Sequence, residues 1–302
     1  MQKAVTPAMS AAYLDGGYDR LAGFVVRAED VAWATTPADL FEAHGLGFPG
    51  SPFTADAPHV DVLRFPATPQ LRFENATGGP DQKTRELTGG PFVDRPPFQG
   101  TGFVLAPGHL VPLYWLVHSR VPAGSELVRV AADGTSTLLA RYVDVGYAWV
   151  SDVVTVTPSP NPRISRLVGP MAKWENTYLS ADVLGDDVVV VAEVEPPAAY
   201  GFERTPAGRF RRVVPKAETT ELFEMDMSGR WNGLEVRVVD QWPTPDGAGV
   251  SRVSYTGHNA DLAEGLQLPK VDAAVYEVTV PTDHLVEVVT TQLVPASWTT
   301  SG

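Results

Sequence analysis

The sequence predicts an α+β protein that is predominantly β, with internally duplicated small antiparallel, SH3-like barrels or meanders and short helices. Three observations predict this fold. The same order of short motifs occurs near both ends of the chain, apolar and polar residues alternate over short stretches, and the 302 residues include 27 glycines and 27 prolines. Alternation with period two is typical of half-buried strands, and glycine and proline mark the turns between them.

The repeated order of motifs relates residues 36–73 to residues 259–288. Each segment contains Ala-Asp-Leu, then Gly-Leu, then an apolar stretch that ends in proline, and then a second apolar stretch. A shared order at long separation is typical of internal duplication. We therefore expect two similar units, each with one helix and two strands.

Each unit is expected to begin with a short helix whose ends are marked in the sequence. Thr36 is a good N-cap, and Pro37 fits the first helical position. Gly45 is placed to end the helix in the left-handed conformation. Asn259 and Gly265 predict the same start and stop for the second helix.

The remaining strands predict one small barrel or meander in each half of the chain. In residues 113–145, apolar stretches flank an Asp-Gly turn, and residues 221–256 repeat this outline around a loop rich in proline and glycine. Residues 158–170 begin with closely spaced prolines, which exclude a helix or a central strand. They predict a linker between an N-terminal half, residues 1–157, and a C-terminal half, residues 171–302.

The formal net charge of −13 disfavours nucleic acid and anionic membranes as partners. It favours solubility, a basic protein partner or a highly charged cytoplasm. The one compact basic run, Arg209-Phe210-Arg211-Arg212, is typical of a solvated strand edge. No apolar stretch is long enough to span a membrane, and the first residues lack a classical signal peptide. We expect a cytoplasmic protein, or one exported without such a signal, and the composition is typical of bacteria with GC-rich genomes.

The sequence predicts neither a cofactor nor a metal. Without cysteine there is no thiolate ligand or cysteine nucleophile. The Gly-x-Gly-x-x-Gly motif that begins at Gly45 follows a helix instead of a strand, which does not fit a dinucleotide site. His59 and Asp61 share a strand face, but a surface pair explains them better than a metal site.

Several residues resemble the pattern of ADP-ribosyltransferase toxins. Glu193-Val194-Glu195 places two glutamates at a strand end, Thr135-Ser136-Thr137 is a hydroxyl triplet, and Arg120 lies upstream. The resemblance implies a transferase that uses Glu193 or Glu195, and a hydrolytic enzyme with the same glutamates belongs to the same alternative. The strand and turn expected around the triplet are missing. Both glutamates also fit the exposed face of a strand, so this enzyme remains the second hypothesis.

Aromatic residues near loops suggest a binding surface, although they also fit the core of each barrel. The candidates are Tyr142, Tyr147, Trp149, Trp231, Trp242 and Tyr255.

Because no nucleophile, metal set or cofactor loop stands out, the leading hypothesis is a non-enzymatic protein-binding or accessory protein. An immunity protein or a component of a secretion or phage-like assembly fits this description. A purely structural, duplicated module of a larger chain is a third hypothesis.

Overall fold

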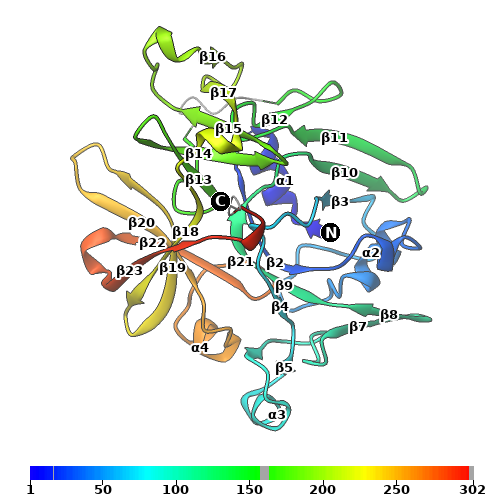
Figure 1. Cartoon of the computed structure of the whole chain (residues 1–302). Helices are drawn as coiled ribbons and strands as arrows, with labels where there is room; N and C mark the ends of the chain where they lie inside the picture. The colour runs from blue at the N-terminus through cyan, green and yellow to red at the C-terminus, as the bar shows by residue number, and fades with distance from the viewer. Residues whose placement is uncertain (16, 157–162, 299–302) are drawn as a thin grey trace.

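Antiparallel strands make up most of the computed structural model, which describes residues 1–15, 17–156 and 163–298. Figure 1 shows one sheet on each side of the molecule, with a smaller group of strands between them. The described strands form open meanders and close no barrel. The prediction of a β-rich chain with short helices is confirmed, and the SH3-like detail is not.

The N-terminal sheet has five strands in the order β1-β3-β10-β11-β12. Two helices, α1 and α2, and a 3-10 turn at Glu29–Val31 accompany it. The bounds are β1 Gln2–Val5, α1 Pro7–Asp15, α2 Pro37–Ala43, β3 His59–Arg64, β10 Ser125–Ala131, β11 Ser136–Tyr142 and β12 Trp149–Val150.

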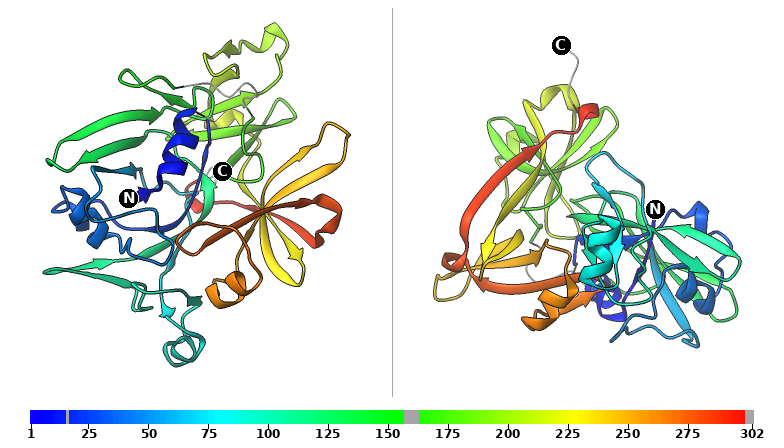
Figure 2. Two further views of the ribbon diagram at one scale, coloured as in Figure 1. Left: turned by 180° about the vertical axis from the view of Figure 1, so that it is seen from behind. Right: turned by 90° about the horizontal axis from the view of Figure 1, so that it is seen from below.

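The C-terminal sheet has eleven strands, in the order β16-β17-β15-β14-β13-β18-β19-β20-β22-β21, with β23 paired to β18. Figure 2 shows β23 as a long strand near the end of the chain, and it pairs with β18 along most of its length. The strand bounds are β13 Pro170–Trp174, β14 Thr177–Leu184, β15 Asp187–Ala192, β16 Glu203–Arg204, β17 Phe210–Pro215, β18 Glu221–Trp231, β19 Leu234–Pro243, β20 Gly249–Tyr255, β21 Lys270–Asp272, β22 Val275–Pro281 and β23 Val286–Leu293. The helix α4 spans Ala260–Gly265, and 3-10 turns occupy Ala198–Tyr200, Lys216–Glu218, Thr282–His284 and Ala296–Trp298.

The shorter strands form three further sheets. The central strand β9 pairs with β2 and β4, β5 pairs with β6 in parallel, and β7 and β8 form a hairpin. The bounds are β2 Arg20–Val25, β4 Phe73–Asn75, β5 Gly78–Gly79, α3 Gln82–Thr88, β6 Phe92–Val93, β7 Phe103–Ala106, β8 His109–Pro112 and β9 Tyr114–Arg120.

The helix caps are predicted better than the duplication. The Thr36 and Asn259 side chains both accept a hydrogen bond from the third helical residue, as expected of N-caps. Gly45 has the predicted left-handed φ of 61°. Gly265 is instead the last residue of α4, and Gln267 has the positive φ, so that stop was placed wrongly.

The strands that follow the two helices have different neighbours. β3 lies inside the N-terminal sheet between β1 and β10, whereas β22 lies in the C-terminal sheet and β23 is exposed along most of its length. The duplication of these units is therefore not confirmed.

The predicted linker falls partly outside the described residues, which omit 157–162. Within the rest of it, residues 163–170, Ile164, Ser165 and Val168 are buried. A cluster that includes Val26, Phe92 and Val275 also joins the two halves. The described part of the segment is therefore a packed connection.

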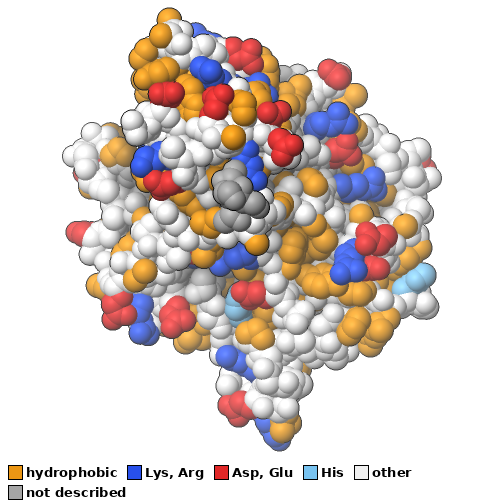
Figure 3. Space-filling model, in the orientation of Figure 1, with side chains coloured by type: hydrophobic (Ala, Val, Ile, Leu, Met, Phe, Trp, Pro, Cys, Tyr) orange, Lys and Arg blue, Asp and Glu red, His pale blue; other side chains and the backbone are white. Residues whose placement is uncertain are grey.

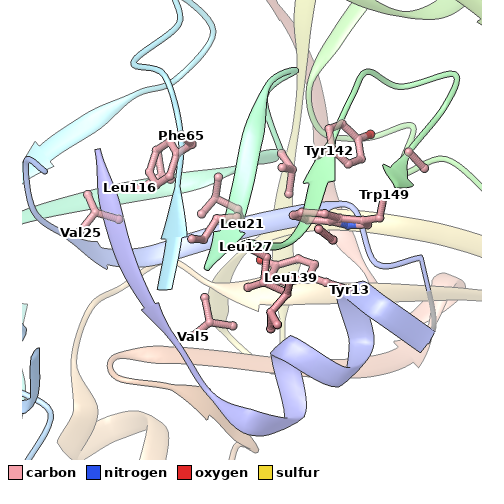
Figure 4. Packing of buried hydrophobic residues seen from close by; sticks show 14 of the residues in the cluster. Val5, Tyr13, Leu21, Val25, Phe65, Leu116, Leu127, Leu139, Tyr142 and Trp149 are labelled. Atoms are coloured by element: carbon pink, nitrogen blue, oxygen red, sulfur yellow. The ribbon is translucent and has the colours of Figure 1, made fainter. Parts of the chain in front are cut away.

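One large apolar cluster lies between the N-terminal sheet, α1 and the strands β2 and β9, as Figure 4 shows. Tyr13 on α1 points into it and contacts Trp149, with ring centroids 4.9 Å apart. Tyr142 meets the same indole edge-on at 5.4 Å. Both Tyr142 and Trp149 are therefore core residues without surface for a partner.

A buried guanidinium fixes the junction between the halves. Arg120, at the end of β9, is 0% exposed and donates hydrogen bonds to the carbonyl oxygens of Ser165, Pro170 and Ala181. The Asp182 carboxylate lies 3.9 Å from it. Burial raises the pKa of Asp182 to about 6, and Arg120 opposes that rise. Removal of Arg120 would leave buried acceptors and a carboxylate unpaired.

We expect Arg120→Met to lower the free energy of unfolding by about 3 kcal/mol or more, because a buried charge loses its partner. The matched control is Arg141→Met, since Arg141 is exposed and pairs with Glu126 at 2.7 Å. A change within about 0.5 kcal/mol is expected there. Urea unfolding measures both variants, and equal losses would contradict the role given to Arg120.

Candidate functional site

A cleft of about 350 Å³ lies where β4 and β9 face the C-terminal sheet. Its walls combine charged, hydroxyl and aromatic side chains from both halves of the chain. They are Arg72, Glu74, Trp115, Val117, His118, Asp226, Ser228, Arg237, Ser254, Tyr255, Thr256, His258, Thr291 and Leu293.

The sheet side of the cleft is built from a polar row across four neighbouring strands. Ser228 on β18 is opposite Arg237 on β19, Arg237 is opposite Ser254 on β20, and Ser254 is opposite Glu277 on β22. Directly opposite residues share one face of a sheet. Ser228 is exposed, whereas Arg237, Ser254 and Glu277 are buried. A face covered by a second group of strands is ordinarily apolar, so these three buried polar residues are a functional candidate.

Arg237 connects the row to β9. Its guanidinium is 3% exposed, donates to the His118 carbonyl oxygen, and lies 3.3 Å from Glu224 and 3.4 Å from Asp226. Burial lowers the pKa of Arg237, while both carboxylates act in the opposite direction. At the rim, Arg72 pairs with the same Asp226 at 2.5 Å. The charges of the two arginines are thus balanced by two carboxylates, Glu224 and Asp226.

A second pair joins β9 to β22 at the wall of the cleft, where His118 is a lining residue. His118 Nε2 lies 2.9 Å from Glu277 Oε1, and both side chains are buried. Burial lowers the pKa of His118. Burial alone would raise the pKa of Glu277, but the hydrogen bond with His118 and nearby arginines lower it. A neutral imidazole therefore donates its Nε2 proton to an ionised carboxylate, and Nδ1 carries no proton.

His258 occupies an unusual position at the entrance to α4. Its φ of 50° is left-handed, a conformation that costs energy for a residue with a side chain. The ring lies 4.2 Å from Phe92 and 5.0 Å from Trp115, between centroids. Its Nδ1 is buried and has no hydrogen-bond partner among the described residues. Burial lowers the pKa of His258 to about 4, so the ring is neutral near pH 7.

Glu74 is the carboxylate of the cleft without a matching cation. His258 Nε2, at 3.6 Å from Glu74 Oε2, is the only basic nitrogen of the described residues within ion-pair distance. That imidazole is neutral. Burial raises the pKa of Glu74, and the more distant Arg72 opposes the rise. Glu74 therefore presents a free acceptor beside the Trp115 and His258 rings.

Of the aromatic candidates from the sequence, Tyr255 lines this cleft. Trp231 packs against the apolar cluster beneath α4. Tyr147 lies under the Arg211 guanidinium at 5.1 Å, and Trp242 lies under that of Arg163 at 5.0 Å. Tyr255 also belongs to the cluster that Trp231 contacts, so these four residues occupy three locations, and the structure does not bring the six candidates together.

The residues that resemble the transferase pattern have structural contacts. Arg120 is fully buried at the junction. Glu193 accepts a hydrogen bond from the Ile164 backbone N at 2.8 Å and pairs with Arg166, whereas Glu195 is exposed. Glu193 thus holds the described end of the predicted linker. We therefore expect Glu193→Gln to lower the free energy of unfolding, and we expect no direct effect on a reaction.

Sequence reasoning missed the cleft because its members are single polar residues on separate strands. Alternation along β19 assigns Leu234, Val236 and Val238 to the core, and it assigns Arg237 to solvent. Arg237 is buried against β9 instead. A glycine at position 258 would have indicated a left-handed φ, but a histidine does not. The sequence therefore contains no sign of this conformation.

Comparison with known proteins finds no relative of this chain. No family model, curated protein or solved structure matches it. Among the described residues, no group of three or more histidine, aspartate or glutamate side chains could hold a metal ion. None of the described helices is both long and apolar enough to cross a membrane. The cleft therefore has to be interpreted from its own chemistry.

We expect the free energy of unfolding to fall as the pH decreases from about 7 to about 4.5. Unfolded His258 takes up a proton near its ordinary pKa of about 6.5, whereas the folded residue resists protonation until the pH approaches 4. His258→Asn should remove up to about 2 kcal/mol of that acid-induced loss, since asparagine tolerates a positive φ. Urea unfolding at several pH values measures the slope, with His284→Asn as the control. An unchanged slope in His258→Asn would contradict the buried, neutral state.

Proposed function

We propose that the chain is a non-enzymatic protein-binding or accessory protein that receives a basic side chain of its partner in the cleft. Immunity proteins and components of secretion or phage-like assemblies are proteins of this kind. The observation that carries the proposal is Glu74, a carboxylate without a cation, held next to aromatic rings at the mouth of a cleft.

This arrangement suits a guanidinium or ammonium group. A carboxylate accepts charge-assisted hydrogen bonds from such a group. Asp226 supplies a second carboxylate in the lining of the same cleft, whereas the Trp115 and Tyr255 rings beside it are buried. Binding would leave Glu74 paired, which removes part of the cost of holding a carboxylate at a partly buried position.

The charge of the whole molecule supports the same kind of partner. A net charge of −13 attracts basic proteins at long range and raises the rate of encounter. Figure 3 shows acidic, basic and hydrophobic side chains interspersed over one face of the molecule. Specificity therefore has to come from a defined site such as the cleft.

The pair formed by His118 and Glu277 favours a second candidate, a hydrolytic enzyme. A neutral histidine oriented by a carboxylate is the arrangement of a general base. Ser254, opposite Glu277 in the sheet and in the lining of the cleft, is a hydroxyl group near that pair. This candidate uses residues other than Glu193 and Glu195.

Selection of a phage-displayed library of random peptides on the immobilised protein tests the proposal. We expect the selected peptides to be enriched in arginine and lysine. Glu74→Gln should weaken their binding by at least about tenfold, because a charged partner loses its counter-charge. Glu86→Gln, on the exposed face of α3, is the matched control and should bind as wild type does.

Peptides without basic residues, or equal binding by wild type and Glu74→Gln, would overturn the proposal. Cleavage of an ester substrate by wild type that His118→Gln abolishes would establish the second candidate in its place.

A further inference from the structure

We propose that a second site, the groove between α1, the loop of residues 52–58 and β3, binds an amphiphilic monoanion. Such a ligand has one carboxylate or sulfonate group on a hydrophobic body. The groove has a volume of about 620 Å³, which lies within the usual range of about 300–1,000 Å³ for small-molecule sites. It shares no lining residue with the cleft, so the proposal does not depend on the proposed function.

The walls of the groove are mainly apolar. Residues of α1 and its approach form one wall, and the proline-containing loop before β3 forms the other, with Phe53 among its residues. The apolar lining comprises Val5, Pro7, Ala11, Leu14, Pro52, Phe53, Ala57, Pro58 and Val60. A hydrocarbon chain or aromatic ring placed there would gain about 25 cal/mol for each Å² of apolar surface removed from water.

The polar end of the groove is an ion pair that presents donors. Asp61 is buried and accepts hydrogen bonds from Ser10 Oγ at 2.6 Å, Arg129 Nε at 2.8 Å and Arg129 Nη2 at 2.9 Å. Its oxygens are therefore occupied. The Arg129 side chain is 39% exposed, and its Nη1 donates to no described residue. The group left for a ligand is a hydrogen-bond donor with a positive charge.

These contacts determine which charged group of a ligand fits the polar end of the groove. An arginine held by one carboxylate can still bind a second acceptor through its remaining N–H groups, and carboxylate or sulfonate oxygens fit it. A cationic head would find the Asp61 oxygens already engaged. Asp15, at the other end of α1, also lines the groove, and its charge opposes ligands with several negative groups. The fitting ligand therefore carries one negative charge.

The pairing of Asp61 with Arg129 has an effect other than stabilising the fold. The two residues are directly opposite each other on β3 and β10. A buried carboxylate that is fully paired adds little net stability compared with an apolar residue of similar size. Its effect here is to hold the guanidinium at the base of an open groove.

Calorimetric titration with decanoate, below its micelle concentration, tests the site on the whole chain. We expect decanoate to bind wild-type protein and to displace the fluorescent probe 8-anilinonaphthalene-1-sulfonate. The alcohol 1-decanol and the cation decylammonium have the same hydrocarbon chain. They should bind at least about tenfold more weakly, because the alcohol has no negative charge to pair with Arg129 and the ammonium group has no acceptor atom.

Two variants examine the two ends of the groove separately. Ala11→Trp should fill the apolar part without disturbing the ion pair, since Ala11 is exposed. Arg129→Gln should remove the charged donor. Each should weaken decanoate binding by at least about tenfold, whereas Arg141→Gln, on the neighbouring strand β11, should bind as wild type does.

Thermal unfolding identifies a variant that has lost its fold, and Ala11→Trp keeps the test valid if Arg129→Gln unfolds. Equal binding of the three decyl compounds, or decanoate binding that Ala11→Trp leaves unchanged, would overturn the proposal. Absence of decanoate binding by wild type would do the same.

Discussion

The position of β9 depends on the buried guanidinium of Arg120, and the cleft depends on the position of β9. Arg120 joins this strand to the carbonyl groups of Ser165, Pro170 and Ala181. His118, two residues earlier on the same strand, contacts Glu277 and Arg237 at the wall of the cleft. The close approach also requires a glycine at position 169, because its φ is 82° and a Cβ there would lie 2.5 Å from the Arg120 Cβ.

The two halves are joined by polar contacts as well as by apolar packing. Asp19 accepts hydrogen bonds from the Ser165 backbone N at 3.0 Å and from its hydroxyl at 2.6 Å, close to Arg20 and Asp240. Buried charges of this kind contribute little net stability, but each tolerates few alternative partners. They therefore define how the sheets are aligned, and a cleft whose walls come from both halves keeps one shape.

The sequence predicts what short-range chemistry determines. Thr36 and Gly45 mark α2 because a cap and a left-handed glycine act within one helical turn. The same rule failed at Gly265, where Gln267 adopts the left-handed conformation instead. The cleft was beyond prediction, since His118 and Glu277 meet only after two sheets have formed and packed. Its polar row follows from strand register, which one sequence does not reveal.

The two proposed sites have opposite chemistry on one acidic molecule. In the cleft, Glu74 is a carboxylate without a cation, whereas in the groove Arg129 keeps donors that Asp61 does not use. The net charge of −13 attracts a basic partner to the first site and repels an anion from the second. Added salt screens both long-range effects. In the groove, screening of the long-range repulsion opposes screening of the Arg129 charge. Salt therefore weakens binding in the cleft more than binding in the groove, so the size of the salt dependence distinguishes the sites.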